Sequence, residues 1–486
     1  MKILGILPEK NFFPFLYNPM KRKVLFFVLT LIACNFSRAQ VFELDTLQYK
    51  GNPDQFINLV MMGDGYTAAQ QDQFVSAAQG LSDYLFTQKP FDAYRNYFNV
   101  FAIRVISTES GVVHPGTASD CAGAQVPVSN PQTFFDTRFD AYGIHRLVVP
   151  FNENAIAGVL ADNFPAYDQV FIISNSPYYG GSGGPFATST TNINSNEITA
   201  HEIGHSFAYL ADEYYAGDIY AIEKPNQTQQ TNPTQVKWKN WLGGNNVGIY
   251  QHCCGGQSAS WYKPHNNCKM KMLFAPLCAV CSEAIVEKIH GLSDPLFSFS
   301  PVESTVNSTQ QYLDFSLNLI RPQPNTLKTE WKMNGNILAV NADSIRIDQL
   351  VLPNGDYSIT AVITDTTAMV RTDGHASLHF STVNWTFSRL FTKTRVIATS
   401  NAISLSVSPN PTDEFLNISL ELTNPEYFSL DVLSVEGKLV RRLADEIRVN
   451  GNFDRQFSLE KLPAGEYLML FRIGNSTQTR RIVKQN

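Results

Sequence analysis

The spacing of apolar residues changes near residue 295 of this 486-residue chain, and that change constrains the fold more than any other feature. Before it, continuous apolar runs alternate with amphipathic segments, of which residues 68–86 have a helical pattern. Four runs predict buried strands: residues 56–62, 98–105, 145–149 and 169–174. Strands that alternate with helices predict an α/β (α+β) domain over residues 41–295.

Beyond residue 295 the sequence alternates apolar and polar residues, the period of a strand with one buried face. The alternating segments are residues 313–319, 344–348, 356–363 and 377–380. Turn residues such as Pro353-Asn-Gly355 separate them, which predicts an immunoglobulin-like β-sandwich over residues 296–396. Residues 403–486 repeat the pattern as a second, smaller β-sandwich domain.

The composition fits folded domains with substantial cores. Hydrophobic residues make up 44% of the chain, and charged residues make up only 16%, below the ~25% usual for globular proteins. The low charge argues against long solvated helices and disorder. A net charge of -6 gives no reason to expect nucleic acid as a partner.

The N-terminus has the pattern of a secretory signal peptide. The basic stretch Lys21–Lys23 precedes ten apolar residues, Val24–Ala33, which are too few to span a bilayer. Small residues at Ser37 and Ala39 then match a cleavage site. We expect residues 1–39 to be removed, and we find no later segment long and apolar enough for a transmembrane helix.

Cysteine usage agrees with export. Cys34 lies in the signal segment and offers an alternative cleavage site of the lipoprotein type. The mature chain keeps six cysteines: Cys121, Cys253, Cys254, Cys268, Cys278 and Cys281. An even number in an exported protein predicts disulfides. Cys278-Ala-Val-Cys281 could instead be half of a structural zinc site or a redox pair.

The segment 196–214 contains His201-Glu202-Ile-Gly-His205. Two histidines four residues apart project from one helix face, so both imidazoles can reach a single ion. The neighbouring residues are largely apolar, and a buried glutamate between two histidines is costly unless it has a partner or a chemical role. The pattern predicts a catalytic Zn²⁺ site with Glu202 as general base.

A catalytic zinc needs a third protein ligand and one open position. Asp212 and Glu213 follow His205 closely, as in metzincins, where the helix breaks and the chain returns a ligand. We favour Asp212 because its short side chain suits a tight return, with Glu213 as the alternative. The glycine usual at the break is absent, and Asp would replace the usual His. For the methionine beneath a metzincin metal, the candidate is Met270 rather than Met272.

At these residues the chain resembles the IgA-peptidase family of zinc metallopeptidases. The resemblance covers about residues 50–295 and rests on an ordered set of segments. These are 59–66, 178–184, His201–His205 with 210–214, 261–264, 267–270 and 278–283. It implies a metzincin-like fold with an appended β-sandwich, zinc ligands His201, His205 and Asp212, and Glu202 as base. It does not imply that immunoglobulin A is the substrate.

The last 80 residues resemble a different family, the C-terminal sorting domain of the Bacteroidetes type IX secretion system. The matching segments are Val407–Pro411, Asp431–Gly437, Leu462–Leu468 and the basic ending Arg480–Lys484. The resemblance implies contact with that secretion machinery and a protein that is secreted or attached to the cell surface.

Together these features predict a secreted, monomeric, zinc-dependent endopeptidase that acts on proteins or peptides. The strand at 169–174 would take the place of the metzincin upper edge strand, and the glycine-rich segment after it would pair with an extended substrate. We expect Tyr214 to pack against the helix. One alternative is a surface adhesin or glycan-binding protein with a vestigial metal site, and another is a zinc enzyme that deacetylates glycans.

Overall fold

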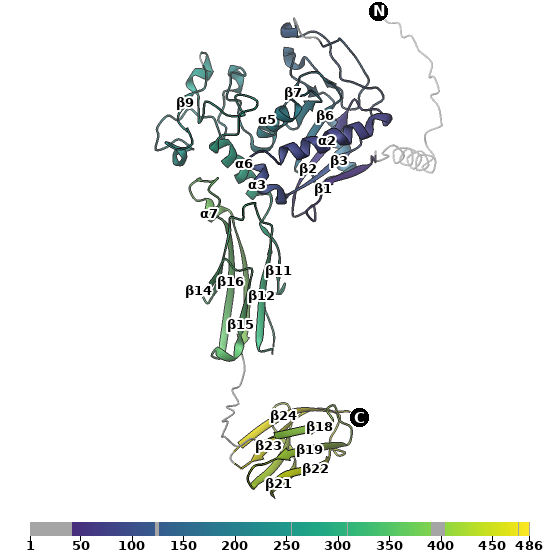
Figure 1. The fold of residues 1–486 in the computed structure, drawn as a ribbon, viewed down its shortest axis with the longest axis vertical. Helices are drawn as coiled ribbons and strands as arrows, with labels where there is room; N and C mark the ends of the chain where they lie inside the picture. Colours follow the sequence, from purple (N-terminus) through teal and green to yellow (C-terminus); the bar gives the residue numbers. More distant parts are fainter. Residues whose placement is uncertain are drawn as a thin grey trace, which may run out of the picture. The chain divides into compact units, whose positions relative to one another are not determined.

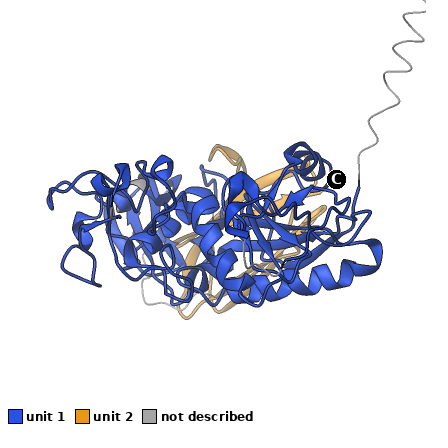
Figure 2. Ribbon diagram, turned by 90° about the horizontal axis from the view of Figure 1, so that it is seen from above, with its two compact units in different colours: residues 1–389 blue, residues 390–486 orange. Residues whose placement is uncertain are grey.

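The computed structural model describes residues 41–121, 126–253, 255–308, 310–389, 404–474 and 476–485. These residues belong to two compact units, residues 1–389 and 390–486, which Figure 2 shows in blue and orange. The expected signal peptide, residues 1–39 with Cys34, lies outside the described residues. No helix within the described ranges has both the length and the apolar character that a membrane span requires.

A six-stranded mixed sheet forms the centre of the N-terminal domain (Figure 1), with strand order β1-β3-β2-β6-β8-β7. The strands are β1 (Leu44–Gln48), β2 (Ile57–Asp64), β3 (Phe98–Ile103), β6 (Gln169–Ser174), β7 (Gly181–Ser182) and β8 (Ala187–Thr190). The four inner strands are parallel, whereas β1 and β7 pair antiparallel at the two edges. The inner strands are buried along their whole length, which explains their continuous apolar runs.

Helices cover both faces of this sheet. They are α2 (Gln71–Leu85), α3 (Phe91–Tyr94), α4 (Glu153–Asn163), α5 (Ser195–Ala208) and α6 (Ala279–Leu292). Leu59 and Met61 of β2 share a core with α2, α3, α5 and α6, whereas Val60 and Met62 share a separate core with α4. Successive residues of one strand therefore fill opposite layers, and the domain has three layers.

Two of the strands predicted from the sequence do not form as predicted. Of residues 145–149 only Val149 enters a strand, in β5 (Val149–Pro150), which pairs with β4 (Thr137–Arg138). The preceding residues run beside β7 instead, since Gly181 N donates to Arg146 O and Val148 N donates to Gly181 O. A short apolar run cannot distinguish a full sheet strand from an extended segment that borders one.

The second error lies at residues 377–380. The chain forms a short helix, α7 (His375–Leu378), and the strand begins only at Phe380. Gly374, with φ +79°, starts this helical turn, and His379 N donates to His375 O to close it. Four alternating residues fit one helical turn as well as a strand, so the pattern was too short to decide.

Two antiparallel sheets follow the N-terminal domain within the first unit, with orders β11-β12-β15 and β14-β13-β16-β17. Their strands are β11 (Leu296–Ser300), β12 (Tyr312–Leu319), β13 (Leu327–Met333), β14 (Asn336–Val340), β15 (Ser344–Asp348), β16 (Gly355–Asp365) and β17 (Phe380–Arg389). Both sheets contribute to one core, where the Trp331 and Trp385 rings stack with centroids 5.8 Å apart beside Phe315. Each sheet thus buries one face, as the alternation predicts. Short strands β9 (Tyr250–Gln251) and β10 (Tyr262–Lys263) pair with each other in the N-terminal domain.

The second unit also contains two antiparallel sheets, with orders β18-β19-β22 and β21-β20-β23-β24. Its strands are β18 (Ser404–Ser408), β19 (Phe415–Glu421), β20 (Glu426–Leu433), β21 (Leu439–Val449), β22 (Asn452–Ser458), β23 (Gly465–Ile473) and β24 (Ser476–Lys484). Leu416 and Ile418 of one sheet and Met469 and Phe471 of the other share a core that contains residues of this unit alone.

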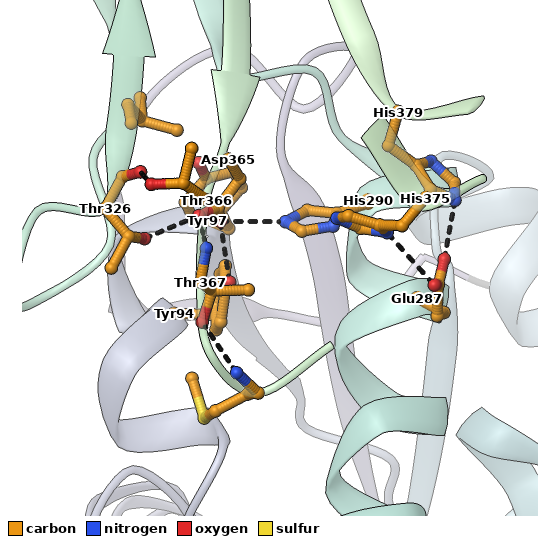
Figure 3. Close-up of polar contacts among 12 residues, drawn as sticks. Tyr94, Tyr97, Glu287, His290, Thr326, Asp365, Thr366, Thr367, His375 and His379 are labelled. Atoms are coloured by element: carbon orange, nitrogen blue, oxygen red, sulfur yellow. Dashed lines mark hydrogen bonds and ion pairs between the residues drawn. The ribbon is translucent and has the colours of Figure 1, made fainter. Parts of the chain in front are cut away.

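Asp365, the last residue of β16, joins the first β region to the N-terminal domain (Figure 3). Its Oδ2 accepts hydrogen bonds from Tyr94 Oη at 2.6 Å and His290 Nε2 at 3.0 Å, and its Oδ1 accepts one from Thr326 Oγ1 at 2.5 Å. Burial alone would raise the pKa of this carboxyl, but the hydrogen bonds from His290, Thr326 and Tyr94 lower it below its usual value. The junction therefore favours the ionised carboxylate.

Glu287 of α6 makes a second contact of this kind, because its carboxylate bonds His375 Nδ1 at 3.0 Å and His379 Nε2 at 2.7 Å (Figure 3). The helix α6 thus anchors both the end of β16 and the segment around α7.

Asp365→Asn should destabilise the first unit by about 2–4 kcal/mol near pH 7, because the amide cannot accept the same set of hydrogen bonds. The carboxyl has a lower pKa in the folded chain than in the unfolded chain, where it is ~3.9. Its contribution is therefore present above about pH 4 and lost as the pH falls through the folded pKa. Urea unfolding of both proteins at several pH values measures this difference.

Asp356→Asn on the exposed part of β16 is the matched control and should leave the unfolding midpoint unchanged. Equal stability of Asp365→Asn and the wild type at pH 7, or a difference independent of pH, would contradict the assignment.

Candidate metal centre

Helix α5 presents His201 and His205 on one face and is buried around much of its circumference. The helix ends at Ala208, and Tyr209 adopts a left-handed conformation with φ 55°. Tyr209 N donates to His205 O, and Leu210 N donates to Gly204 O, which closes the helix end. Tyr209 thus makes the break for which the sequence lacks a glycine, and the chain turns back toward the histidines.

The turn brings Asp212 beside the two imidazoles. His201 Nε2 and His205 Nε2 are 3.1 Å apart, and Asp212 Oδ1 lies 3.1 Å and 3.3 Å from them. Tetrahedral zinc with bonds of ~2.0–2.1 Å places neighbouring ligand atoms roughly 3.3–3.4 Å apart, so the triangle has the size that one ion needs. Asp212 Oδ1 is buried and has no well-oriented hydrogen-bond donor among the described residues. The donor set therefore fits zinc.

Main-chain carbonyls orient both imidazoles. His201 Nδ1 donates to Lys269 O at 2.9 Å, and His205 Nδ1 donates to Leu210 O at 2.8 Å. With Nδ1 protonated in this way, each Nε2 keeps its lone pair toward the common centre, the arrangement typical of metal-binding histidines.

The carboxylates and imidazoles of the site shift one another's pKa values. Burial alone would raise the pKa of Asp212, but the adjacent imidazoles of His201 and His205 lower it below its usual value. Burial alone would lower the pKa of His205, yet Asp212 and Glu202 raise it to about 9. The arrangement favours positive charge between the three groups.

Glu202 lies at a pocket of about 280 Å³ next to His201. The pocket is lined by Arg146, Leu147, Tyr179, Gly181, Ile198, His201, Glu202, Tyr214, Lys269, Lys271, Met272 and Leu273. Burial raises the pKa of the Glu202 carboxyl above its usual value, although His201 and His205 act in the opposite direction. A carboxylate with a raised pKa beside a pocket is suited to exchange protons.

The structure separates the two methionine candidates. Met270 is fully buried beneath α5, where a Cβ on Gly204 would lie only 2.6 Å from Met270 Sδ. Met272 is 48% exposed and lines the pocket. Met270 thus packs against α5 at Gly204, next to His205 in the sequence, and the absence of a Cβ there lets it approach the helix backbone.

The edge strand beside the pocket is β7. The expectation that residues 169–174 form the edge strand is therefore wrong. That segment forms β6, which lies between β2 and β8 inside the sheet. The glycine-rich segment passes directly over α5, since a Cβ on Gly183 would lie 2.7 Å from His205 Cβ and 3.0 Å from Glu202 Oε2. Only glycine lets the backbone approach the site this closely.

The remaining sequence candidates lie elsewhere or have other roles. Glu213 is fully buried and belongs to a cluster with three cysteines rather than to the group of His201, His205 and Asp212. Tyr214 packs at the site as expected, with its ring stacked on His201 at a centroid distance of 6.3 Å. No sequence pattern pointed to Arg146, which lines the pocket and whose guanidinium lies 5.8 Å from the Tyr214 ring centroid.

The disulfide prediction does not hold for Cys121, Cys268, Cys278 and Cys281, which are free thiols. Cys268 Sγ and Cys281 Sγ are 3.6 Å apart, far longer than the ~2.05 Å of an S–S bond. Cys278 and Glu213 join them in one group. Three thiols in one cluster cannot all be paired with one another in disulfides. The CxxC spacing of Cys278 and Cys281 was the sequence signal that these cysteines could serve as metal ligands instead.

Comparisons with known proteins agree with two sequence resemblances. Residues 46–248 match the family model described as IgA Peptidase M64, and residues 406–485 match the Secretion system C-terminal sorting domain. No curated protein matches the chain significantly.

Solved structures give only weak similarity. Dimeric latent PorU from Porphyromonas gingivalis is 13% identical, with 39% of this chain and 20% of that chain covered and a TM-score of 0.16. Fibronectin(III)-like modules of CbhA from Clostridium thermocellum are 13% identical, with 38% and 90% covered and a TM-score of 0.14. This chain spans about a fifth of the length of the PorU chain. Scores this low carry no argument about the fold.

Asp212→Ala should lower zinc affinity by more than the ~10–100-fold that loss of an outer-sphere partner costs, because it removes a direct ligand. Competition with a chromophoric chelator measures the affinity. Asp54→Ala, at an exposed position, is the control and should bind zinc as the wild type does. Unchanged affinity in Asp212→Ala would exclude this residue as a ligand.

The family matches confirm both resemblances and support a peptidase. Residues 46–248 match the IgA Peptidase M64 family model, and residues 406–485 match a C-terminal sorting domain, which indicates export and secretion or cell-surface attachment.

Proposed function

We propose that this protein is a secreted zinc endopeptidase. The observation that carries the proposal is the triangle of His201 Nε2, His205 Nε2 and Asp212 Oδ1, with edges of 3.1, 3.1 and 3.3 Å, beside Glu202 at a pocket. The triangle lies within the segment that matches the peptidase family.

His201, His205 and Asp212 would hold the ion, with Lys269 O and Leu210 O fixing the imidazoles. Zinc bound there would polarise a substrate carbonyl and lower the pKa of a water to ~7. Glu202 would take the proton of the attacking water and pass it to the leaving amine. Its raised pKa suits both transfers, because the carboxyl must gain and lose a proton within one cycle.

The substrate would lie extended along the pocket rim formed by β7 and residues 146–147. Gly181 already bonds Arg146 O and Val148 N on one side and pairs with β8 on the other. Peptide pairing would therefore fall to backbone beyond it, around Gly183, which lies closest to Glu202. Arg146 adds a positive charge to this rim and would attract substrate carbonyl or carboxylate oxygens.

The main alternative is an adhesin or glycan-binding protein with a vestigial metal site. A purely structural zinc site is closed by four protein ligands, whereas this centre offers three and borders a pocket. A structural site also has no use for a half-buried glutamate at that pocket. These features favour catalysis over a vestigial role.

Glu202→Gln should bind zinc as the wild type does and lose about 10²–10⁴-fold in kcat, because it removes the proton acceptor and leaves the ligands. Cleavage of a fluorogenic peptide library, with and without chelator, measures the loss. Glu153→Gln on the exposed side of α4 is the control. Full activity in Glu202→Gln with normal zinc content would refute the mechanism.

Gly183→Ala should also reduce activity, because the new methyl would lie 2.7 Å from His205 Cβ and 3.0 Å from Glu202 Oε2. We expect at least a tenfold loss in kcat/KM, in line with the cost of a displacement of about 1 Å at a catalytic site. Gly80→Ala on α2 has no atom within 4 Å of the added methyl and should keep full activity. Equal activity in both variants would remove Gly183 from the site.

A further inference from the structure

We propose that Glu213, Cys268, Cys278 and Cys281 form a second zinc site, which is closed and structural. It lies apart from the histidine pair and uses none of its ligands. The four residues come from three parts of the chain: the return after α5, the segment that contains Met270, and the N-terminal end of α6.

The spacing of the donor atoms matches a tetrahedral zinc ion. Cys268 Sγ and Cys281 Sγ are 3.6 Å apart, and Cys281 Sγ lies 3.4 Å from Glu213 Oε1. A Zn–S bond of ~2.3 Å gives roughly 3.7–3.8 Å between two sulfurs of a tetrahedron, and a shorter Zn–O bond brings oxygen closer. All four ligand atoms lie within 4.8 Å of one another. One ion at their centre can therefore reach every donor.

Burial gives a second and independent reason for a cation. Glu213, Cys268 and Cys281 are 0% exposed and Cys278 is 6% exposed. Buried carboxylates and thiolates are costly unless they are paired or coordinate a metal. Lys263, a nearby buried cation, bonds the main-chain oxygen of Glu213 rather than its carboxylate.

The hydrogen bonds around the cluster leave ligand positions open. Asn226 Nδ2 donates to Glu213 Oε1 at 3.1 Å, whereas Glu213 Oε2 is buried without a hydrogen-bond partner among the described residues. Cys278 N lies 3.3 Å from Cys268 Sγ and donates to it, a contact that stabilises a thiolate. Asn226 and this amide are the outer-sphere partners that metal ligands require.

A disulfide is the competing explanation in an exported protein. Any one pair among the three cysteines would leave a third thiol and a carboxyl buried without a function. The 3.6 Å separation of Cys268 Sγ and Cys281 Sγ is also that of ligands rather than of a bond. Three thiolates and a carboxylate complete four-fold coordination, so no position remains for water or substrate.

The second site would position the catalytic centre. Glu213 follows Asp212 directly, and Glu213 N donates to Met270 O at 2.7 Å. Cys268 precedes Lys269, whose carbonyl accepts the hydrogen bond from His201 Nδ1. The ion would thus hold in place one catalytic ligand, the backbone partner of another, and the methionine beneath α5.

The test uses the full chain with both catalytic histidines replaced, His201→Ala/His205→Ala, so that zinc at the catalytic centre does not contribute. Zinc per chain is measured by mass spectrometry after dialysis against a weak chelator. Adding Cys281→Ser should remove one equivalent of zinc from this background, whereas adding Cys253→Ser, at a half-buried cysteine outside the cluster, should remove none. Cobalt in the first protein should show thiolate-to-metal charge-transfer absorption that Cys281→Ser abolishes.

The wild-type chain provides a readout that needs no variant to fold. Unfolding it in iodoacetamide without reductant should leave Cys268, Cys278 and Cys281 all alkylated in peptide maps. A disulfide among these three, or equal zinc content with and without Cys281→Ser, would overturn the proposal. Neither measurement depends on peptidase activity, so the second site and the proposed function succeed or fail separately.

Discussion

The turn at Tyr209 is the feature on which the rest of the candidate site depends. A helix can align His201 and His205, but it cannot place a third ligand on the same ion, because the next residues of its face move away along the axis. The left-handed residue ends the helix at Ala208 and sends the chain back, so that Asp212 reaches both Nε2 atoms. Leu210, within the turn, also supplies the carbonyl that orients His205.

A second group of contacts holds this turn against the segment around Met270. Lys269 O orients His201, Met270 packs against Gly204, and Glu213 N bonds Met270 O. These contacts join residues about 60–70 positions apart in sequence, and the buried pair of Lys269 Nζ and Glu197 Oε2, 2.5 Å apart, adds another link between the segment and α5. The geometry of the metal ligands therefore depends on tertiary packing as much as on the helix that carries them.

Sequence patterns predicted the parts of this structure that local physics determines. The buried run at 169–174 coincides with β6, and the spacing of His201 and His205 places both on one helix face. The patterns failed where long-range contacts decide the local conformation or the position of a residue. Arg146 lines the pocket because its chain segment borders β7, and Ser377 enters a helical turn instead of a strand. The disulfide prediction failed for the same reason. The even number of cysteines predicts disulfide pairing, but only the fold brings Cys268, Cys278 and Cys281 together with Glu213.

The central claim is that one zinc ion is held by His201, His205 and Asp212. Anomalous scattering on both sides of the zinc absorption edge, from crystals of the purified protein, tests it most directly. The claim predicts an ion ~2.0–2.2 Å from His201 Nε2, His205 Nε2 and Asp212 Oδ1, with the remaining position facing the pocket. An ion ligated by Glu213 in place of Asp212, or no zinc between the two histidines in zinc-saturated crystals, would contradict it.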